Sequence, residues 1–313
     1  MADMEMRAVL AQQLKEMMEK DPKVVVIDAD LAKASGTWGL RKDFPDRAID
    51  VGIAEQNMVS IASGMASYGY KPFITSFTPF VSRRVCDQIT LSSCYAKQPI
   101  TIVGTDPGIC AEINGGTHMG MEDIGVLRSI AGIVIFEPVD TVQLKQALPI
   151  IANLGKTVYI RLFRKKIDDV FGDDYKFDLF KADTIKEGKD VTIFCTGIMV
   201  QETVKAMDLL KAEGIDAEII NVHTIKPIDK DTIVKSVAKT GCAVTAENHN
   251  IIGGLFSAVS EVLATSMPTP VLPIGVPDTF GEVGKMPYLK QIYKMTAEDI
   301  VAKAKEVMKL KNK

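Results

Sequence analysis

VGIAEQNMVSIASGMASYG, residues 51–69, combines the end of a strand with a helix built largely from small residues. Gly52 lies at the transition, and the apolar residues Phe73–Thr75 follow the helix as a further buried strand. A strand, a helix and a second buried strand in this order are typical of a βαβ unit. The segment therefore predicts a parallel α/β sheet, with Glu55 in a helical first turn at the carboxyl end of a strand, where such sheets bind ligands.

The same alternation continues on both sides of this segment. Short runs that are continuously apolar favour a parallel sheet with helices on both faces. The expected strands are 24–27, 73–75, 100–103, 133–136, 157–160, 191–194, 217–220, 242–246 and 271–276. The expected helices are 54–68, 80–94, 142–153, 200–213, 229–239, 253–264 and 297–310.

A charged stretch poor in aliphatic residues, 165–190, interrupts the alternation. Such composition is typical of a solvated linker between domains. The 313 residues also suit two domains of about 150 residues each. The sequence predicts two α/β domains, 1–165 and 188–313, joined by a linker over 166–187.

Composition excludes several classes of protein. Lys and Arg number 37 against 40 Asp and Glu, so the net charge of −3 gives no indication of nucleic-acid binding. The sequence has no run of about 18 apolar residues of the kind that predicts a membrane span, and its charged N-terminus does not resemble a signal peptide. We therefore expect a cytoplasmic protein. Five cysteines without a CxxC pair argue against disulfides or zinc. The phosphate loop GxxxxGK[ST] and the dinucleotide motif GxGxxG are both absent.

Two further segments carry candidate site residues. In SFTPFVSRRVCDQI, residues 76–89, Phe77, Phe80 and Arg83 are spaced three apart and share one face if the segment is helical. Two aromatic rings there would flank a flat apolar ligand, although core packing is the alternative. The Gly-rich loop 105–125 contains His118 and follows a strand, where loops often carry function, although a plain surface position is the equally weighted alternative. For Glu55, stabilisation of a helix start is the alternative.

Taken in order, these segments resemble the pyrimidine-binding domain of the transketolases. The resemblance is carried by IDADL, FPDRAIDVGIAEQNMVSIASGMASYG, SFTPFVSRRVCDQI and NGGTHMGMEDIGVLRSIAGIVIFEPVDTVQ. In the second half, GKDVTIFCTGIMV, NVHTIKPID and AENHNIIGGLFSAV resemble the C-terminal domain of that family. The family's diphosphate-binding domain, with its GDG…N signature, has no counterpart here. The resemblance therefore implies the C-terminal subunit of a split, two-chain transketolase.

The family transfers a two-carbon ketol unit between sugar phosphates and uses thiamine diphosphate with a divalent metal. The resemblance implies that the cofactor lies between this chain and an N-terminal diphosphate-binding subunit, which would hold Mg²⁺ or Ca²⁺. No metal ligand is expected in this chain. Self-association as a dimer, a heterotetramer with the partner and a place in the pentose phosphate pathway are implied as well.

The resemblance also assigns roles to individual residues. Glu55 matches the glutamate that hydrogen-bonds the aminopyrimidine ring nitrogen and so activates the cofactor, and His118 matches a substrate-contacting histidine. The implied cofactor-binding residues are Asp30, Glu55, Phe77, Phe80 and Arg83, the last standing where a tyrosine is common. The implied substrate-binding residues are Arg7, Asp106, Asn114, His118 and Arg164.

Two of these residues depart from the family pattern. Asn114 stands where many transketolases have an aspartate, and Asp106 where a phosphate-binding histidine is common. Deoxyxylulose-phosphate synthases also carry Asp at the second place, so the identity of the acceptor stays open. The alternatives are such a synthase-like subunit, the beta subunit of a 2-oxo acid dehydrogenase decarboxylating component, and an inactive regulatory subunit. His223 and His249 are expected to serve packing or an interface.

Overall fold

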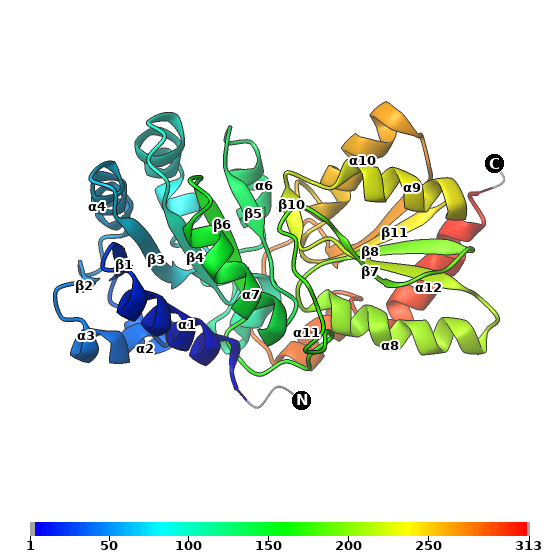
Figure 1. The fold of residues 1–313 in the computed structure, drawn as a ribbon. Helices are drawn as coiled ribbons and strands as arrows, with labels where there is room; N and C mark the ends of the chain where they lie inside the picture. Colours follow the sequence, from blue (N-terminus) through cyan, green and yellow to red (C-terminus); the bar gives the residue numbers. More distant parts are fainter. Residues whose placement is uncertain (1–3, 312–313) are drawn as a thin grey trace.

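The computed structural model describes residues 4–311, which form two sheets side by side (Figure 1). The seven-stranded sheet has the order β10-β5-β6-β4-β3-β1-β2, and the five-stranded sheet has the order β12-β11-β8-β9-β7. Within both sheets nearly all neighbouring strands are parallel; β10 on β5 and β7 on β9 are the antiparallel pairs. This arrangement confirms the predicted α/β class.

The chain forms its elements in the following order. The first half contains α1 (Met6–Lys20), β1 (Val24–Asp28), α2 (Ala32–Ser35), η1 (Thr37–Gly39), α3 (Leu40–Asp43), β2 (Ala48–Asp50), α4 (Glu55–Ser67), β3 (Lys71–Phe77), η2 (Arg83–Val85), α5 (Cys86–Gln88), η3 (Ile89–Tyr95), β4 (Thr101–Thr105), η4 (Gly108–Asn114), α6 (Asp123–Arg128), β5 (Val134–Phe136), α7 (Thr141–Ala152) and β6 (Val158–Leu162). The second half contains β7 (Asp183–Lys186), β8 (Val191–Cys195), α8 (Met199–Ala212), β9 (Ala217–Asn221), β10 (Thr224–Lys226), α9 (Lys230–Thr240), β11 (Ala243–Asn250), α10 (Leu255–Ser266), β12 (Val271–Val276), α11 (Met286–Ile292) and α12 (Ala297–Met308).

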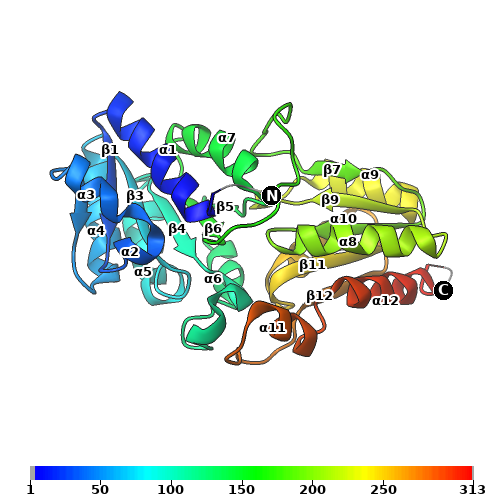
Figure 2. The ribbon, with the colours of Figure 1, turned by 90° about the horizontal axis from the view of Figure 1, so that it is seen from below.

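The continuously apolar strands have the burial that their sequences predict. β1, β4, β6, β8 and β9 are buried at every residue, because helices cover both faces of each sheet. In the first domain α1 packs on α7 over one face (Figure 2), and α4 packs on β3. In the second, α8 pairs with α12 below the sheet and α9 with α10 above it (Figure 1).

Side-chain caps fix several helix starts. Asp140 accepts the backbone N–H of Gln143 at the start of α7, and Asp229 accepts that of Thr232 at the start of α9. Thr296 and Asp299 form a reciprocal capping box at the start of α12. Such caps satisfy the N–H groups that the first turn leaves free, each contributing about 1 kcal/mol. None of residues 4–311 belongs to a helix long and apolar enough to cross a membrane.

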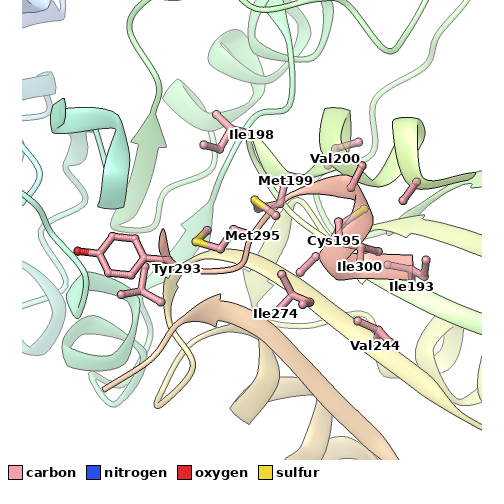
Figure 3. Packing of buried hydrophobic residues seen from close by; sticks show 14 of the residues in the cluster. Ile193, Cys195, Ile198, Met199, Val200, Val244, Ile274, Tyr293, Met295 and Ile300 are labelled. Atoms are coloured by element: carbon pink, nitrogen blue, oxygen red, sulfur yellow. The ribbon is translucent and has the colours of Figure 1, made fainter. Parts of the chain in front are cut away.

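The core of the second domain extends into the first. Figure 3 shows part of a buried cluster in which Cys195, Met199 and Ile274 pack together. The same cluster includes Ile109 and Met119 from the loop between β4 and α6. The loop that carries His118 is therefore built on the core of the second domain.

Besides elements that the sequence-based prediction did not include, such as α1 and α11, the structure differs from it in three places. The helix expected over 80–94 begins later than predicted, at Arg83, because β3 runs to Phe77 and Pro79 follows in a turn. It is also irregular, since it changes from 3-10 through α to π geometry, which begins at Ile89. Within the expected linker, β7 pairs with β9 and Leu179 is buried in the core of the first domain. β10 of the second half joins the first sheet beside β5.

Candidate functional site

Four strand ends of the first sheet meet at one edge and bring most of the predicted residues together. β1 leads to Asp30, β3 ends at Phe77, β4 leads to Asp106 and β6 leads to Arg164. These strands are neighbours and parallel, so their carboxyl ends share this edge. The loop from β4 carries His118 back over the same edge.

Three aromatic side chains form one wall of the site. The ring centroids of Phe77 and Phe80 lie 6.1 Å apart. The His118 imidazole contacts both rings edge-on, at 5.7 Å from Phe77 and 5.3 Å from Phe80. Its Nδ1 is 2.9 Å from the Thr117 hydroxyl. The predicted aromatic pair is thus present, but a strand end and a turn, rather than one helix face, place the rings.

Glu55 begins α4 and is almost fully buried, with 4% of its surface exposed. Its Oε1 accepts a hydrogen bond from Arg84 at 2.5 Å, and the Arg84 guanidinium lies 4.0 Å from the centre of the Phe80 ring. A buried carboxylate beside an aromatic wall is more than a helix start requires, because an acid that only stabilises a helix start can remain exposed to solvent. Sequence reasoning missed Arg84.

The neighbouring arginine has a different partner. Arg83 donates to Glu122 at 2.5 Å, and both side chains are partly exposed. The expectation that it shares a helix face with Phe77 and Phe80 is wrong, because Phe77 is in a strand. The contacts of Arg83 give no support to its predicted cofactor role.

Two arginines from distant parts of the chain converge on one backbone oxygen. Arg7 and Arg164 both donate to the Ala34 carbonyl, at 3.2 and 3.3 Å. Asp106 is buried and accepts from Nε of Arg164 at 2.5 Å, while Glu5 accepts from Nε of Arg7 at 2.7 Å. Burial raises the pKa of Asp106, although Arg164 acts in the opposite direction. The two guanidinium groups are therefore matched by two carboxyl groups.

Asp30 and Asn114 are exposed loop residues, Asp30 just after β1 and Asn114 in the loop that follows β4. Asp30 has a positive φ of 62°, and its backbone N–H donates to Asp50 at 3.1 Å, so its exposed side chain is held in a fixed turn. Asn114 is the exposed last residue of η4. Both positions are open to a ligand, and their predicted roles stay predictions.

A second buried acid lies behind the site at the end of β1. Asp28 accepts the Thr37 hydroxyl at 2.6 Å through Oδ2, but its Oδ1 has no hydrogen-bond partner among residues 4–311. Burial raises the pKa of Asp28 from 3.8 to about 6. A carboxylate that ends the apolar strand VVVID was a signal for this buried acid that the sequence analysis left unused.

Because the pKa of Asp28 is raised, we predict that replacing this residue increases the free energy of unfolding in a pH-dependent way. Ionisation of this carboxyl opposes folding, so its cost is absent below about pH 4 and complete above about pH 6. Asp28→Asn should therefore raise the free energy of unfolding at pH 7.5 by on the order of 1–3 kcal/mol and have little effect near pH 4. Denaturant unfolding at both pH values measures it.

Asp50→Asn is the matched control, and its expected effect on stability at pH 7.5 has the opposite sign. The pKa of Asp50 is lowered because backbone N–H groups and Arg41 stabilise its charge against the cost of burial. Its contribution to stability is present above its ordinary pKa and is lost as the pH falls, so its replacement should destabilise the protein at pH 7.5. A Tm of Asp28→Asn that stays below wild type at pH 7.5 contradicts the assignment.

The remaining histidines and the cysteines have structural positions. His223 and His249 are fully buried, and burial lowers the pKa of each to about 4, so both are neutral packing residues, as expected. All five cysteines are free. Residues 4–311 contain no cluster of three or more His, Cys, Asp or Glu side chains placed to hold a metal ion.

Comparison with known proteins identifies the family. The family model described as the transketolase pyrimidine binding domain matches residues 2–168, and that of the transketolase C-terminal domain matches residues 180–300. The chain therefore belongs to the transketolase family, as the sequence motifs indicated. Dependence on thiamine diphosphate is implied by this membership.

Two relatives and one solved structure are similar to this chain over nearly its whole length. The chain is 49% identical over 299 residues to the 6-deoxy-6-sulfo-D-fructose transketolase subunit SqwH of Clostridium sp. (strain MSTE9), covering 96% of this chain and 93% of the relative. It is 33% identical to one subunit of the apulose-4-phosphate transketolase of Phocaeicola vulgatus, covering 95% of each. A structure described as a split gene transketolase, inactive beta4 tetramer, superimposes with a TM-score of 0.89 at 38% identity and covers 98% of this chain and 99% of that one.

Proposed function

We propose that this chain is the C-terminal subunit of a two-chain transketolase, which transfers a two-carbon ketol unit between sugars that carry a terminal anionic group. The observation that supports this most is the buried Glu55 beside the Phe77–Phe80–His118 wall. A separate N-terminal subunit would supply the diphosphate site together with Mg²⁺ or Ca²⁺. The proposal places the complex in the cytoplasm, as a heterotetramer acting on sugar phosphates of the pentose phosphate pathway.

The residues present fit one half of a thiamine diphosphate site. Phe77 and Phe80 offer an apolar wall for the pyrimidine ring, and Glu55 offers the buried carboxyl that the ring nitrogen requires. When bound, thiamine diphosphate supplies the electron sink for cleavage and formation of the sugar carbon–carbon bond. Glu55 would share a proton with the pyrimidine ring nitrogen, and the aromatic wall would orient the ring and exclude water.

The other residues would act on the sugar. His118, which is part of the aromatic wall, could hydrogen-bond a reacting oxygen of the sugar, and Asn114 would contact the sugar from its exposed position. Asp30 would instead contact the cofactor, as the family resemblance implies. Arg7 and Arg164 converge, so they suit the terminal anion, since a guanidinium group matches such an oxygen cluster. This set of roles favours a sugar substrate over a lipoyl acyl acceptor.

Reconstitution tests this function. The purified chain alone should show no transketolase activity, and mixing it with a subunit that carries the diphosphate domain should restore activity that depends on a divalent metal. Transketolase activity from the rigorously purified single chain contradicts the proposal. A mixture that binds thiamine diphosphate but transfers no ketol unit favours the regulatory alternative.

A sulfonated sugar is the second candidate substrate. It is supported by the 49% identity to the sulfofructose transketolase subunit and by the pairing of Arg164 with Asp106. A phosphate monoester carries nearly two negative charges at pH 7, whereas a sulfonate carries one. Since two carboxyl groups already balance the two arginines, the singly charged group meets less repulsion. Comparing kcat/KM for 6-deoxy-6-sulfo-D-fructose and fructose 6-phosphate as donors distinguishes the candidates.

The Glu55–Arg84 pair predicts competition with the cofactor. Arg84 donates to Oε1 of Glu55 and lies over the Phe80 ring, so we expect binding of the pyrimidine ring to displace it from both. An ion pair with a partly exposed arginine contributes about 0–1 kcal/mol, so Arg84→Ala should tighten cofactor binding by up to about 5-fold. Titration of thiamine diphosphate into the reconstituted complex measures this. A loss of affinity would show that Arg84 itself holds the cofactor. Arg83→Ala, measured in parallel, tests the cofactor role predicted for Arg83.

A further inference from the structure

The second sheet contains the place where open α/β sheets bind ligands, and the first domain fills it. β9 lies on one side of β8 and β11 on the other, so the strand order reverses between β8 and β11. Just beyond β8, Thr196 donates to Oε2 of the buried Glu137 at 3.2 Å. A Cβ added to Gly197 would lie 2.2 Å from Oε1 of Glu137. Glu137 of the first domain therefore fills the place in this crevice that a small molecule would take.

From the same edge, the Asn248 side chain reaches the loop that follows β4. Its Oδ1 accepts the backbone N–H of Ile109 at 2.9 Å, and its Nδ2 donates to the Pro107 carbonyl at 2.8 Å. Asn248 is fully buried. Gly108 is required between these contacts, because it has a φ of 54° and a Cβ there would lie 2.2 Å from Asn248 Oδ1. One amide thus fixes both a donor and an acceptor of the loop backbone.

Further contacts from the second domain hold the rest of this loop. Glu112 accepts the backbone N–H of Met286 at 2.9 Å, and the Met121 carbonyl accepts that of Asn250 at 2.8 Å. A Cβ on Gly116 would lie 2.7 Å from the Gly281 carbonyl oxygen, so two backbones are in direct contact there. The loop is therefore attached to the second domain at its start, middle and end.

We propose that the second domain is the positioning element for the loop 106–121, and that Asn248 is the positioning residue that fixes where Asp106 and His118 stand. Asp106 directly precedes the clamped segment and holds Arg164, and His118 lies between the two later attachments. Glu55 and Phe80 belong to elements that Asn248 does not contact. Loss of the clamp therefore affects binding and reaction of the sugar and leaves activation of the cofactor intact; this kinetic consequence rests on the proposed function.

Asn248→Ala removes the hydrogen bonds of this side chain to Ile109, Pro107 and the Cys110 sulfur. Asn248→Asp keeps only the acceptor for Ile109 and serves in case the alanine variant does not fold. In the free chain, amide hydrogen exchange over residues 108–121 should accelerate by about 10-fold or more, while α4 keeps its protection. In the reconstituted enzyme, KM for the sugar acceptor should rise by about 10- to 100-fold, and exchange of the cofactor's thiazolium proton should keep its wild-type rate.

Glu261→Gln is the matched control, because Glu261 pairs with Arg128 across the same domain boundary without contacting the loop. It should change neither the loop exchange nor KM. Unchanged loop protection in both Asn248 variants overturns the proposal, as does thiazolium exchange that falls as far as turnover. If the wild-type complex proves inactive, the proposed function fails, while the loop exchange in the free chain still supports or overturns the clamp.

Discussion

Glu55→Gln is expected to slow exchange of the thiazolium proton of bound thiamine diphosphate by about 100-fold or more, which is the upper range for a lost acid–base group. The amide is nearly isosteric with the carboxyl group, but it cannot share a proton with the pyrimidine ring nitrogen. Turnover of the reconstituted enzyme should fall at least as far. Hydrogen–deuterium exchange of the cofactor in the assembled complex measures the effect directly.

Glu122→Gln is the control for this change. Glu122 also stands at the start of a helix, α6, but it is partly exposed and pairs with Arg83. It should leave the exchange rate near wild type. Because Arg84 loses its charged partner in Glu55→Gln, the Tm of both variants should be measured as well. An unchanged exchange rate in Glu55→Gln would mean that Glu55 only stabilises the start of α4 and does not activate the cofactor.

Arg164→Ala is expected to raise KM for a substrate with a terminal anion by about 10- to 100-fold, because a charge-assisted hydrogen bond contributes about 1.5–3 kcal/mol. KM for a neutral short aldehyde should change little, since the aldehyde does not reach the Arg7–Arg164 pair. Steady-state kinetics with both acceptors on the reconstituted enzyme provide the comparison.

Arg47→Ala controls for general loss of structure in the same domain. Arg47 donates to the backbone carbonyls of Asp21 and Val24 and has a purely structural place. Arg47→Ala should lower the Tm and should change KM for the anionic and the neutral acceptor to the same extent. Equal effects of Arg164→Ala on both acceptors would mean that this arginine only neutralises Asp106.

Much of the fold could be predicted because the parallel strands are continuously apolar. VVVI at 24–27 and VTIF at 191–194 are strands for this reason, and the helices between them follow from chain length and periodicity. β7 and β10 could not be predicted, because they are short edge strands whose pairing depends on distant partners. The helix expected from residue 80 begins at Arg83 instead, because β3 extends further than its apolar run and Pro79 lies in the following turn.

The site was predicted only in part. The family resemblance marked Phe77, Asp106 and Arg164, and in the structure they lie at or just after the ends of parallel neighbouring strands, which necessarily come together. The sequence-based prediction assigned Arg83 to the cofactor site and did not consider Arg84. Which of these two arginines reaches Glu55 depends on the geometry of the turn 78–82, and in the structure it is Arg84. The pairing of Asp106 with Arg164 joins residues 58 positions apart and has no local signal.

The most direct test of the central claim, that this chain holds half of a thiamine diphosphate site, is equilibrium dialysis of the labelled cofactor. The measurement compares this chain alone, the diphosphate-domain subunit alone and their mixture, each with and without Mg²⁺. The account predicts tight, saturable binding of one cofactor per pair of chains, only in the mixture and only with the metal. Tight stoichiometric binding by this chain alone would contradict it.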